Sequence, residues 1–176
     1  MKNVIVILII ATLVSCKSAK KPKVVTKKTQ VESQNQATLP TEKTHEAFTL
    51  SEQIVTYAKD FLGTRYKWGG TTKKGMDCSG LVFESFRAHN IYLPRISRDM
   101  ARKGTKITLK ETLKGDLIFF KTGKTRRNDI NHVGLVVEIK NNAIYFIHAT
   151  ASKGVLVSSL NEDYWKDAFE EVRRIW

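Results

Sequence analysis

One cysteine in this chain lies where a thiol can act as a nucleophile. Cys78 stands in Asp77-Cys78-Ser79-Gly80-Leu81, where a glycine-containing loop turns into a predicted helix. The main-chain amides at a helix N-terminus lower the pKa of a thiol and can donate hydrogen bonds to an oxyanion. Cys78 is therefore a candidate for covalent thiol chemistry.

Two histidines are predicted to lie at the same end of a β-hairpin. His132 begins one predicted strand, His148 ends the next, and Asn141-Asn142 forms the turn between them. An antiparallel hairpin with this turn brings its two open ends together. A nucleophile, a base and a residue that orients the base need such an arrangement. Each residue alone is more typical of an ordinary sheet histidine or a buried cysteine, but the three together favour catalysis.

The elements that must position these residues are helices followed by strands. Ser51 is a predicted N-cap of a first helix that ends at Gly63. A second helix is predicted to begin near Cys78, and Ser97 to cap a short third one. Apolar and β-branched segments then predict strands at 116–120, 133–139, 143–148, 155–157 and 172–176. This order predicts an α+β fold in which N-terminal helices pack on an antiparallel β-sheet.

The start of the chain is typical of an exported lipoprotein. Residues 1–15 contain a short basic start and an apolar stretch that is too short to span a bilayer but fits a signal peptide. Leu13-Val14-Ser15-Cys16 resembles the bacterial lipobox, in which the cysteine is acylated and becomes the new N-terminus. An ordinary signal peptide that contains a cysteine is the alternative. We expect Cys16 to be lipidated and to anchor the protein in a membrane.

A tether and one folded domain are predicted to follow. Residues 16–47 comprise the lipidated cysteine and a basic segment without aromatic residues, which cannot repay the entropy of ordering. Residues 48–176 form the predicted domain. If Cys16 is acylated, Cys78 has no cysteine partner in the chain, so an intramolecular disulfide is excluded.

The composition leaves several kinds of partner open. Of the 176 residues, 41% are hydrophobic and 27% charged, which excludes a polytopic membrane protein and a fully disordered chain. The formal net charge of +13 suits nucleic acid, an anionic membrane or an anionic wall polymer. There is no nucleic-acid-binding motif, so we expect no nucleic acid partner. There is also no HExxH or CxxC pattern, so we expect no metal and no other cofactor.

Six motifs together resemble the NlpC family of papain-like peptidases, which cut bacterial cell wall. In chain order they are Tyr66-Lys67-Trp68-Gly69-Gly70, Gly75-Met76-Asp77-Cys78-Ser79-Gly80-Leu81, Leu93-Pro94-Arg95, Lys114-Gly115-Asp116-Leu117-Ile118-Phe119-Phe120, His132-Val133-Gly134 and Ile147-His148-Ala149. The resemblance covers about residues 50 to 176. The ending, Asn161-Glu162-Asp163-Tyr164-Trp165 followed by Arg173-Arg174, looks most like the Spr-type murein endopeptidases, lipoproteins of the Gram-negative outer membrane.

The resemblance implies a Cys-His-His catalytic set. Cys78 corresponds to the nucleophile, His132 to the base that keeps it a thiolate, and His148 to the residue that orients His132. Tyr66 corresponds to a tyrosine near the oxyanion hole, with packing beside Trp68 as the alternative.

Four more residues are implied to contact the substrate: Asp77, Ser79, Ser97 and Arg98. Asp77 is equally plausible as the N-cap of the second helix. For Ser97 and Arg98, a helix cap and a surface charge are nearly as good explanations.

The resemblance implies a peptidoglycan endopeptidase, which we expect to be monomeric and lipid-anchored in the cell envelope, on the outer membrane facing the periplasm. The expected target is the D-alanyl–meso-diaminopimelate cross-link. The γ-D-glutamyl–diaminopimelate bond of the stem peptide and a non-catalytic wall-binding lipoprotein are the alternatives. The presence of Cys78, His132 and His148 speaks against the last of these.

Overall fold

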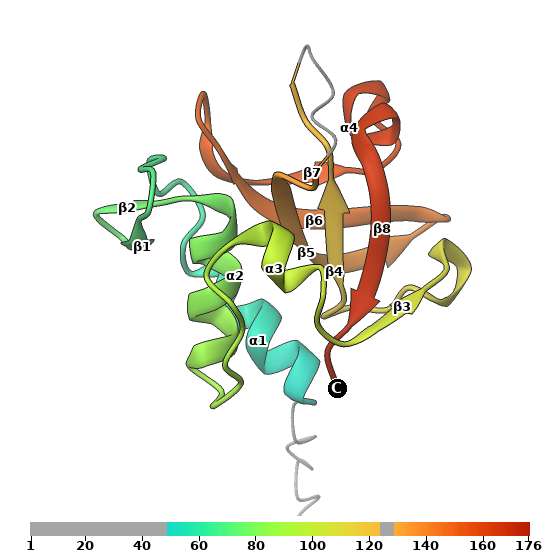
Figure 1. Ribbon diagram of the computed structural model, residues 1–176, viewed down its shortest axis with the longest axis horizontal. Helices are drawn as coiled ribbons and strands as arrows, with labels where there is room; N and C mark the ends of the chain where they lie inside the picture. The colour runs from blue at the N-terminus through green and yellow to red at the C-terminus, as the bar shows by residue number, and fades with distance from the viewer. Residues whose placement is uncertain (1–48, 124–128) are drawn as a thin grey trace, which may run out of the picture. The chain divides into compact units, whose positions relative to one another are not determined.

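The computed structural model describes residues 49–123 and 129–176. The predicted signal peptide, Cys16 and the tether lie outside the described residues. The elements, in chain order, are α1 (Leu50–Lys59), β1 (Thr71–Thr72), β2 (Gly75–Met76), α2 (Cys78–Arg87), α3 (Ser97–Met100), β3 (Thr105–Ile107), the 3₁₀ helix η1 (Leu109–Glu111), β4 (Leu117–Phe120), β5 (His132–Lys140), β6 (Ala143–Thr150), β7 (Gly154–Ser159), α4 (Asp163–Ala168) and β8 (Phe169–Arg174) (Figure 1).

Six of the strands form one antiparallel sheet in the order β3-β8-β4-β5-β6-β7. β1 and β2 form a separate small hairpin ahead of α2. The helices α1 and α2 precede the sheet in the chain and pack against β5. The predicted α+β fold with N-terminal helices on an antiparallel sheet is confirmed.

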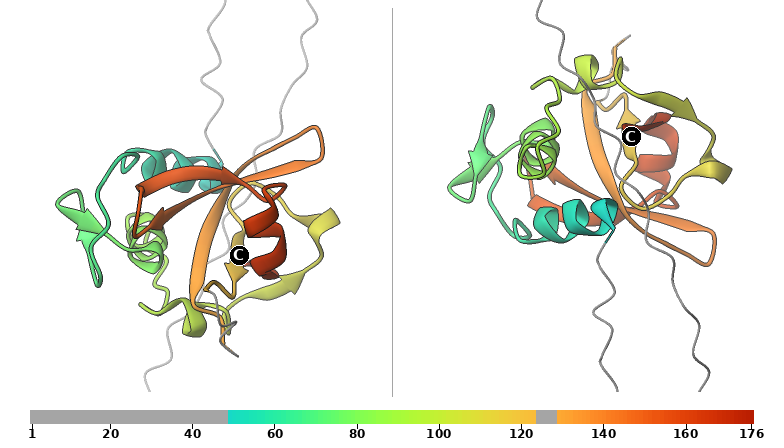
Figure 2. Two further views of the ribbon diagram at one scale, coloured as in Figure 1. Left: turned by 90° about the horizontal axis from the view of Figure 1, so that it is seen from above. Right: turned by 90° about the horizontal axis from the view of Figure 1, so that it is seen from below.

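The sheet carries an apolar core on each face. Leu117 and Phe119 of β4 belong to a cluster that includes residues of α1 and α2, whereas Ile118 and Phe120 belong to one that includes Trp165 of α4. Successive strand residues point to opposite faces, which explains this alternation. α4 accordingly lies on the other side of the sheet from α1 and α2 (Figure 2).

The hairpin of β5 and β6 turns at Asn141 and Asn142, as predicted. Their φ angles are 52° and 61°, and the flanking Lys140 and Ala143 are paired. A two-residue turn that matches the twist of the strands needs positive φ at both positions, and asparagine tolerates it better than most residues.

Several predicted element ends differ from the structure. The N-cap of α1 is Thr49 rather than Ser51, because Thr49 and Glu52 form a reciprocal capping box. α1 ends at Lys59, and single turns continue to Gly63, whose φ is 78°. Ser97 is the first residue of α3 rather than its cap.

The sequence did not predict several short elements, and it predicted a later start for the last strand. β1, β2 and β3 have only two or three residues each, too few for a periodic pattern. α4 was not predicted, and β8 begins at Phe169, earlier than the predicted strand. Within the described ranges, no helix is long and apolar enough to cross a membrane.

Candidate active site

Cys78 is the first residue of α2, and Asp77 is the N-cap. Asp77 Oδ1 accepts a hydrogen bond of 2.6 Å from the main-chain N–H of Gly80. The cap fixes the start of the helix and therefore the direction of the partly buried thiol. Of the two roles the sequence left open for Asp77, the N-cap is the one that this geometry shows.

A network of hydrogen bonds ties the start of α2 to its surroundings. Asp77 Oδ2 accepts from the Gly69 main-chain N–H at 2.7 Å and from Arg95 Nη2 at 2.8 Å. Arg95 Nη1 also donates to Ser79 Oγ at 2.8 Å. A β-carbon at Gly80 would collide with the Gly70 carbonyl oxygen, so this close approach requires glycine. Asp77 and Ser79 are thus engaged in building the loop that holds Cys78.

The two histidines touch across the β5–β6 pair. His132 Nε2 lies 3.0 Å from His148 Nδ1. Leu135 pairs with Ile147, and extending that register by one residue places His148 opposite Gly134, two residues from His132. Diagonal neighbours on one face of a sheet are within reach of ring side chains. The prediction that the hairpin brings the two histidines together is confirmed.

Two residues without a predicted role complete the surroundings of the histidines. Ser158 Oγ on β7 lies 3.1 Å from His148 Nε2. The Trp165 ring of α4 stacks on His132, with 5.2 Å between ring centroids, and meets His148 edge-on at 4.6 Å. His148 is fully buried and His132 almost so. The imidazoles therefore occupy a fixed, largely water-free position.

A single cleft of about 1140 Å³ collects the predicted site residues of the described part of the chain. Its lining includes Tyr66, Asp77, Cys78, Ser79, Ser97, Arg98, His132 and His148. Ser97 is buried, whereas Arg98 is half-exposed and forms an ion pair of 3.7 Å with Asp129. The predicted lipidation residue, Cys16, lies outside the described residues.

Burial in the cleft disfavours the charged forms of its reactive groups, the thiolate of Cys78 and the imidazolium forms of the two histidines. Burial raises the pKa of the Cys78 thiol, and the charge of Asp77 adds to the rise, but the main-chain N–H groups of Val133, Ser79 and Cys78 act in the opposite direction. Burial lowers the pKa of His132 to about 4 and that of His148 to about 3. The resting site therefore favours a neutral thiol and neutral imidazoles at pH 7.

Tyr66 is available as a hydrogen-bond donor. Burial raises the pKa of its hydroxyl, and the negative charges of Cys78 and Asp77 raise it further, which keeps the hydroxyl protonated. The influence of the Cys78 charge reflects the closeness of the two side chains.

Sequence reasoning missed Arg95, Ser158 and Trp165 as parts of the site. Arg95 and Trp165 stood within motifs that carried the resemblance, so a signal was present for both. Ser158 had none, because a single serine in a strand is ordinary. Among the described residues, no group of three or more His, Cys, Asp or Glu side chains gathers where it could hold a metal ion.

A comparison with protein families identifies the family to which this fold and site belong. The model of the NlpC/P60 family matches residues 63–174. The chain belongs to the NlpC/P60 family. The match covers all the cleft residues discussed above, and the predicted family membership is confirmed.

Relatives of known name are peptidases and hydrolases, in agreement with the prediction of a peptidase of this family. The murein DD-endopeptidase MepS/murein LD-carboxypeptidase of Escherichia coli K12 is 40% identical over 127 residues, covering 72% of this chain and 63% of that protein. The probable endopeptidase NlpC of Escherichia coli K12 is 38% identical, covering 81% and 90%. The gamma-DL-glutamyl hydrolase of Bacillus subtilis is 37% identical, covering 74% and 31%.

Solved structures share the fold. An NlpC/P60 family protein of Bacillus cereus superposes with a TM-score of 0.64 at 30% identity, covering 70% of this chain and 39% of that one. A Staphylococcus aureus protein described as similar to lipoprotein, NLP/P60 family, gives a TM-score of 0.63 at 29% identity, covering 77% and 45%.

Proposed function

We propose that this chain is a lipid-anchored peptidoglycan endopeptidase that works through Cys78, His132 and His148. One observation carries the proposal. The thiol at the start of α2 and the hydrogen-bonded pair of histidines line the same cleft. One relative of the chain is named a murein DD-endopeptidase and another a probable endopeptidase, which supports an amide of peptidoglycan as the substrate.

The covalent step uses Cys78 as nucleophile. His132 Nε2 faces His148, so Nδ1 is the ring nitrogen left to accept the thiol proton. As the sulfur bonds to the carbonyl carbon, the carbonyl oxygen becomes an oxyanion that the Cys78 N–H and the Tyr66 hydroxyl can stabilise. His132 then gives its proton to the leaving amine as the C–N bond breaks, which leaves a thioester on the enzyme.

Hydrolysis reverses the roles of the same groups. His132 takes a proton from water, the hydroxide attacks the thioester carbonyl, and the acid product leaves as the thiol regains its proton. Burial opposes either charge alone, but a thiolate and an imidazolium in contact stabilise each other. We therefore infer that the ion pair forms as the substrate is attacked, from a neutral resting pair.

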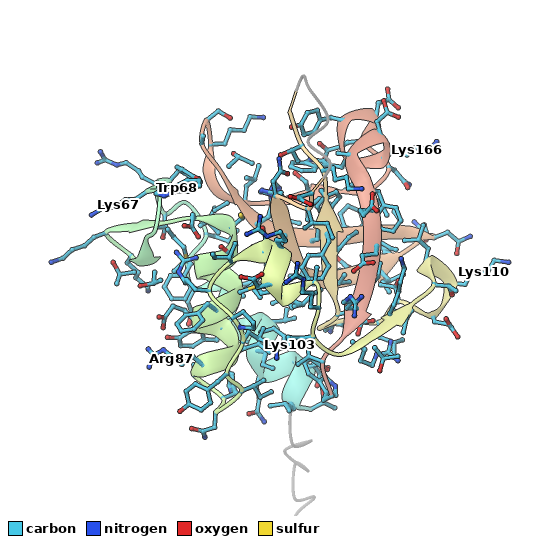
Figure 3. The ribbon with its side chains drawn as sticks, viewed as in Figure 1. Lys67, Trp68, Arg87, Lys103, Lys110 and Lys166 are labelled. Atoms are coloured by element: carbon cyan, nitrogen blue, oxygen red, sulfur yellow. The ribbon has the colours of Figure 1, made fainter. Side chains whose placement is uncertain are left out.

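A group of cations beside the cleft supports an anionic substrate. Five exposed cations, none of which has an ion-pair partner within the described residues, lie on adjacent segments, and Lys153 among them lines the cleft: Arg65, Lys67, Lys73, Lys74 and Lys153. Figure 3 shows Lys67 and Trp68 near each other at the left of the view, and Lys110 at the far right. Gly154 packs against Thr64 and Arg65, which brings the β6–β7 turn next to this group. Peptidoglycan peptides carry carboxylates that such a cationic surface beside the cleft attracts.

For the target bond we propose the D-alanyl–meso-diaminopimelate cross-link. The relative named murein DD-endopeptidase favours it. The γ-D-glutamyl–diaminopimelate bond is the second candidate, which the relative named gamma-DL-glutamyl hydrolase favours. A non-catalytic wall-binding role is the third reading, and the shared placement of Cys78, His132 and His148 speaks against it.

The test is digestion of purified sacculi, with mass spectrometry of the released fragments. Cross-link cleavage converts dimeric muropeptides to monomers without shortening the stems, whereas γ-D-glutamyl cleavage releases fragments with a new amino-terminal diaminopimelate. Cys78→Ala serves as the matched control, since it removes only the sulfur. No fragments from the wild-type protein, or equal amounts from Cys78→Ala, would refute the proposed function.

We also propose that Cys16 carries the lipid anchor and that the monomer acts at the outer membrane, facing the periplasm. The lipobox-like Leu13-Val14-Ser15-Cys16 supports the anchor, as does the similarity to the Staphylococcus aureus protein described as similar to lipoprotein. Cys16→Ser should leave the protein uncleaved or soluble on fractionation of cells. Normal processing with continued membrane partitioning would contradict the anchor.

A further inference from the structure

His148 has a hydrogen-bond partner on each ring nitrogen. Nδ1 lies 3.0 Å from His132 Nε2, and Nε2 lies 3.1 Å from Ser158 Oγ. Ser158 is itself buried, on β7, where it pairs with Phe146 and so lies diagonally from His148 on the same face. These contacts form one chain, from His132 through His148 to Ser158.

The direction of the protons along this chain decides whether His132 can act as a base. To accept a thiol proton on Nδ1, neutral His132 must carry its own proton on Nε2, which then donates to His148 Nδ1. His148 must in turn carry its proton on Nε2. If the chain runs the other way, His148 donates to His132 Nε2, the His132 proton lies on Nδ1, and no base faces the thiol.

Ser158 supplies the acceptor that the productive direction requires. A hydroxyl accepts through its lone pairs while its own hydrogen points elsewhere. Once His132 has taken the thiol proton, both of its nitrogens are donors, and only the productive direction remains. Without Ser158 Oγ, the buried Nε2–H of His148 would be left unpaired at that moment.

Within the described part of the chain, no other group on the packed elements replaces this contact. From α4 the histidines meet Trp165, which carries no charge. At the start of α2, the charge of Asp77 acts to raise the pKa of His132. Cys78, also at the start of α2, lines the same cleft as the histidines. Among the described residues, no carboxylate hydrogen bonds to either imidazole.

We propose that Ser158 is a positioning residue, whose Oγ accepts the Nε2–H of His148 and so holds His148 Nδ1 as the acceptor for His132 Nε2–H. The effect of Ser158 on turnover rests on the proposed function. The effect of Ser158 on the tautomer of His148 does not, because that tautomer is a property of the free protein.

The kinetic test compares Ser158→Ala with Ser158→Thr in the full chain. Alanine should lower kcat roughly 10- to 100-fold with KM nearly unchanged, because a buried N–H loses its partner as charge forms. The acid limb of the pH–kcat profile should move to lower pH, since the protonated pair is the form that loses an acceptor. Threonine keeps the hydroxyl and should restore both. Ser159→Ala is the matched control, because the one hydrogen bond of Ser159 Oγ within residues 49–123 and 129–176 comes from the neighbouring Asn161 N–H.

A second measurement does not need turnover. Nitrogen-15 NMR of histidine-labelled protein, with His148→Gln to assign the signal, should show His148 protonated on Nε2 in the wild type and in Ser158→Thr. Ser158→Ala should shift it toward the Nδ1 form. If wild-type protein cuts no peptidoglycan but shows this pattern, the proposed function fails and the role of Ser158 stands. The role of Ser158 would be overturned if folded Ser158→Ala kept the wild-type kcat, acid limb and His148 tautomer. It would also be overturned if threonine failed to restore what alanine removes.

Discussion

The two halves of the cleft are held in place by different kinds of contact. The thiol half depends on residues close in sequence: Asp77 caps the helix that Cys78 begins, and Gly80 donates to that cap. The imidazole half depends on strand register, since His132, His148 and their neighbours come from β5, β6, β7 and α4. Arg95 is the distant residue that secures the thiol half.

The difference teaches what each half can tolerate. The cap and the ion pair at the start of α2 are polar, and Arg95 is partly exposed although Asp77 is buried, so losing Arg95 loosens the thiol without opening the apolar core. The histidines are buried against Trp165, and their positions depend on the sheet as a whole. We expect substitutions around the thiol to lower activity gradually. Substitutions around the imidazoles should abolish proton transfer and, with it, most of the activity.

The largest effect is expected from removing either reacting group. Cys78→Ala should abolish turnover and cost at most about 1 to 2 kcal/mol of stability, because a small side chain at a helix start packs little. His132→Gln should fall to the same level, since His132 both takes and gives protons. Release of fragments from sacculi measures both, with circular dichroism as the control for folding. Wild-type rates in Cys78→Ala would rule out covalent thiol catalysis.

A smaller loss is expected at the orienting residue. His148→Gln should keep measurable activity, because glutamine can still accept from His132 Nε2–H. The acid limb of its pH–rate profile should move, since the partner of His132 sets the apparent pKa values of the coupled groups. If this variant is as inactive as His132→Gln while remaining folded, His148 does more than orient. Full activity with an unmoved limb would place His148 outside the chemistry.

The thiol half can be loosened without touching a reacting group. Arg95→Gln removes the ion pair to Asp77, and we expect about a tenfold fall in kcat and a loss of about 1 to 3 kcal/mol in the free energy of unfolding. Arg87→Gln is the matched control, because in the part of the chain that the structure describes the one ion pair of Arg87 is with Glu84, on the surface of α2. Equal behaviour of the two variants would show that the Arg95 network does not position Cys78.

The smallest expected effect concerns stability in acid. Burial lowers the pKa of His132 to about 4 and of His148 to about 3, so between pH 6.5 and 4 the unfolded chain binds more protons than the folded one. Stability should therefore fall as the pH drops, by up to about 1.4 kcal/mol per pH unit for each histidine. Urea unfolding at pH 7, 6 and 5 measures this slope.

The control for that slope is the double variant His132→Gln/His148→Gln, which should be less sensitive to acid, whereas Cys78→Ala should keep the wild-type slope. The pKa values of Glu52, Glu111 and Glu171 are lowered from 4.5, so the stability from these carboxylates is lost only at lower pH. An unchanged slope in the double variant would contradict the burial of neutral histidines.

The same contrast explains what the sequence could predict. Cys78 at a helix start and the turn at Asn141-Asn142 were predictable because their signals lie within a few residues. Ser158 and Trp165 were not assigned roles, because their contacts with His148 depend on how β7 and α4 dock, which no local pattern encodes. Thr49 was missed as a cap because Ser51 offers the same chemistry two residues later.

The central claim is that His132 activates Cys78, and the rate at which an alkylating reagent modifies Cys78 as a function of pH tests it most directly. At pH 6 the wild-type thiol should react at least tenfold faster than the thiol of His132→Gln, because His132 takes the proton as the sulfur attacks, whereas the variant keeps a buried thiol of raised pKa without a base. Equal rates for wild type and His132→Gln across the pH range would contradict the account.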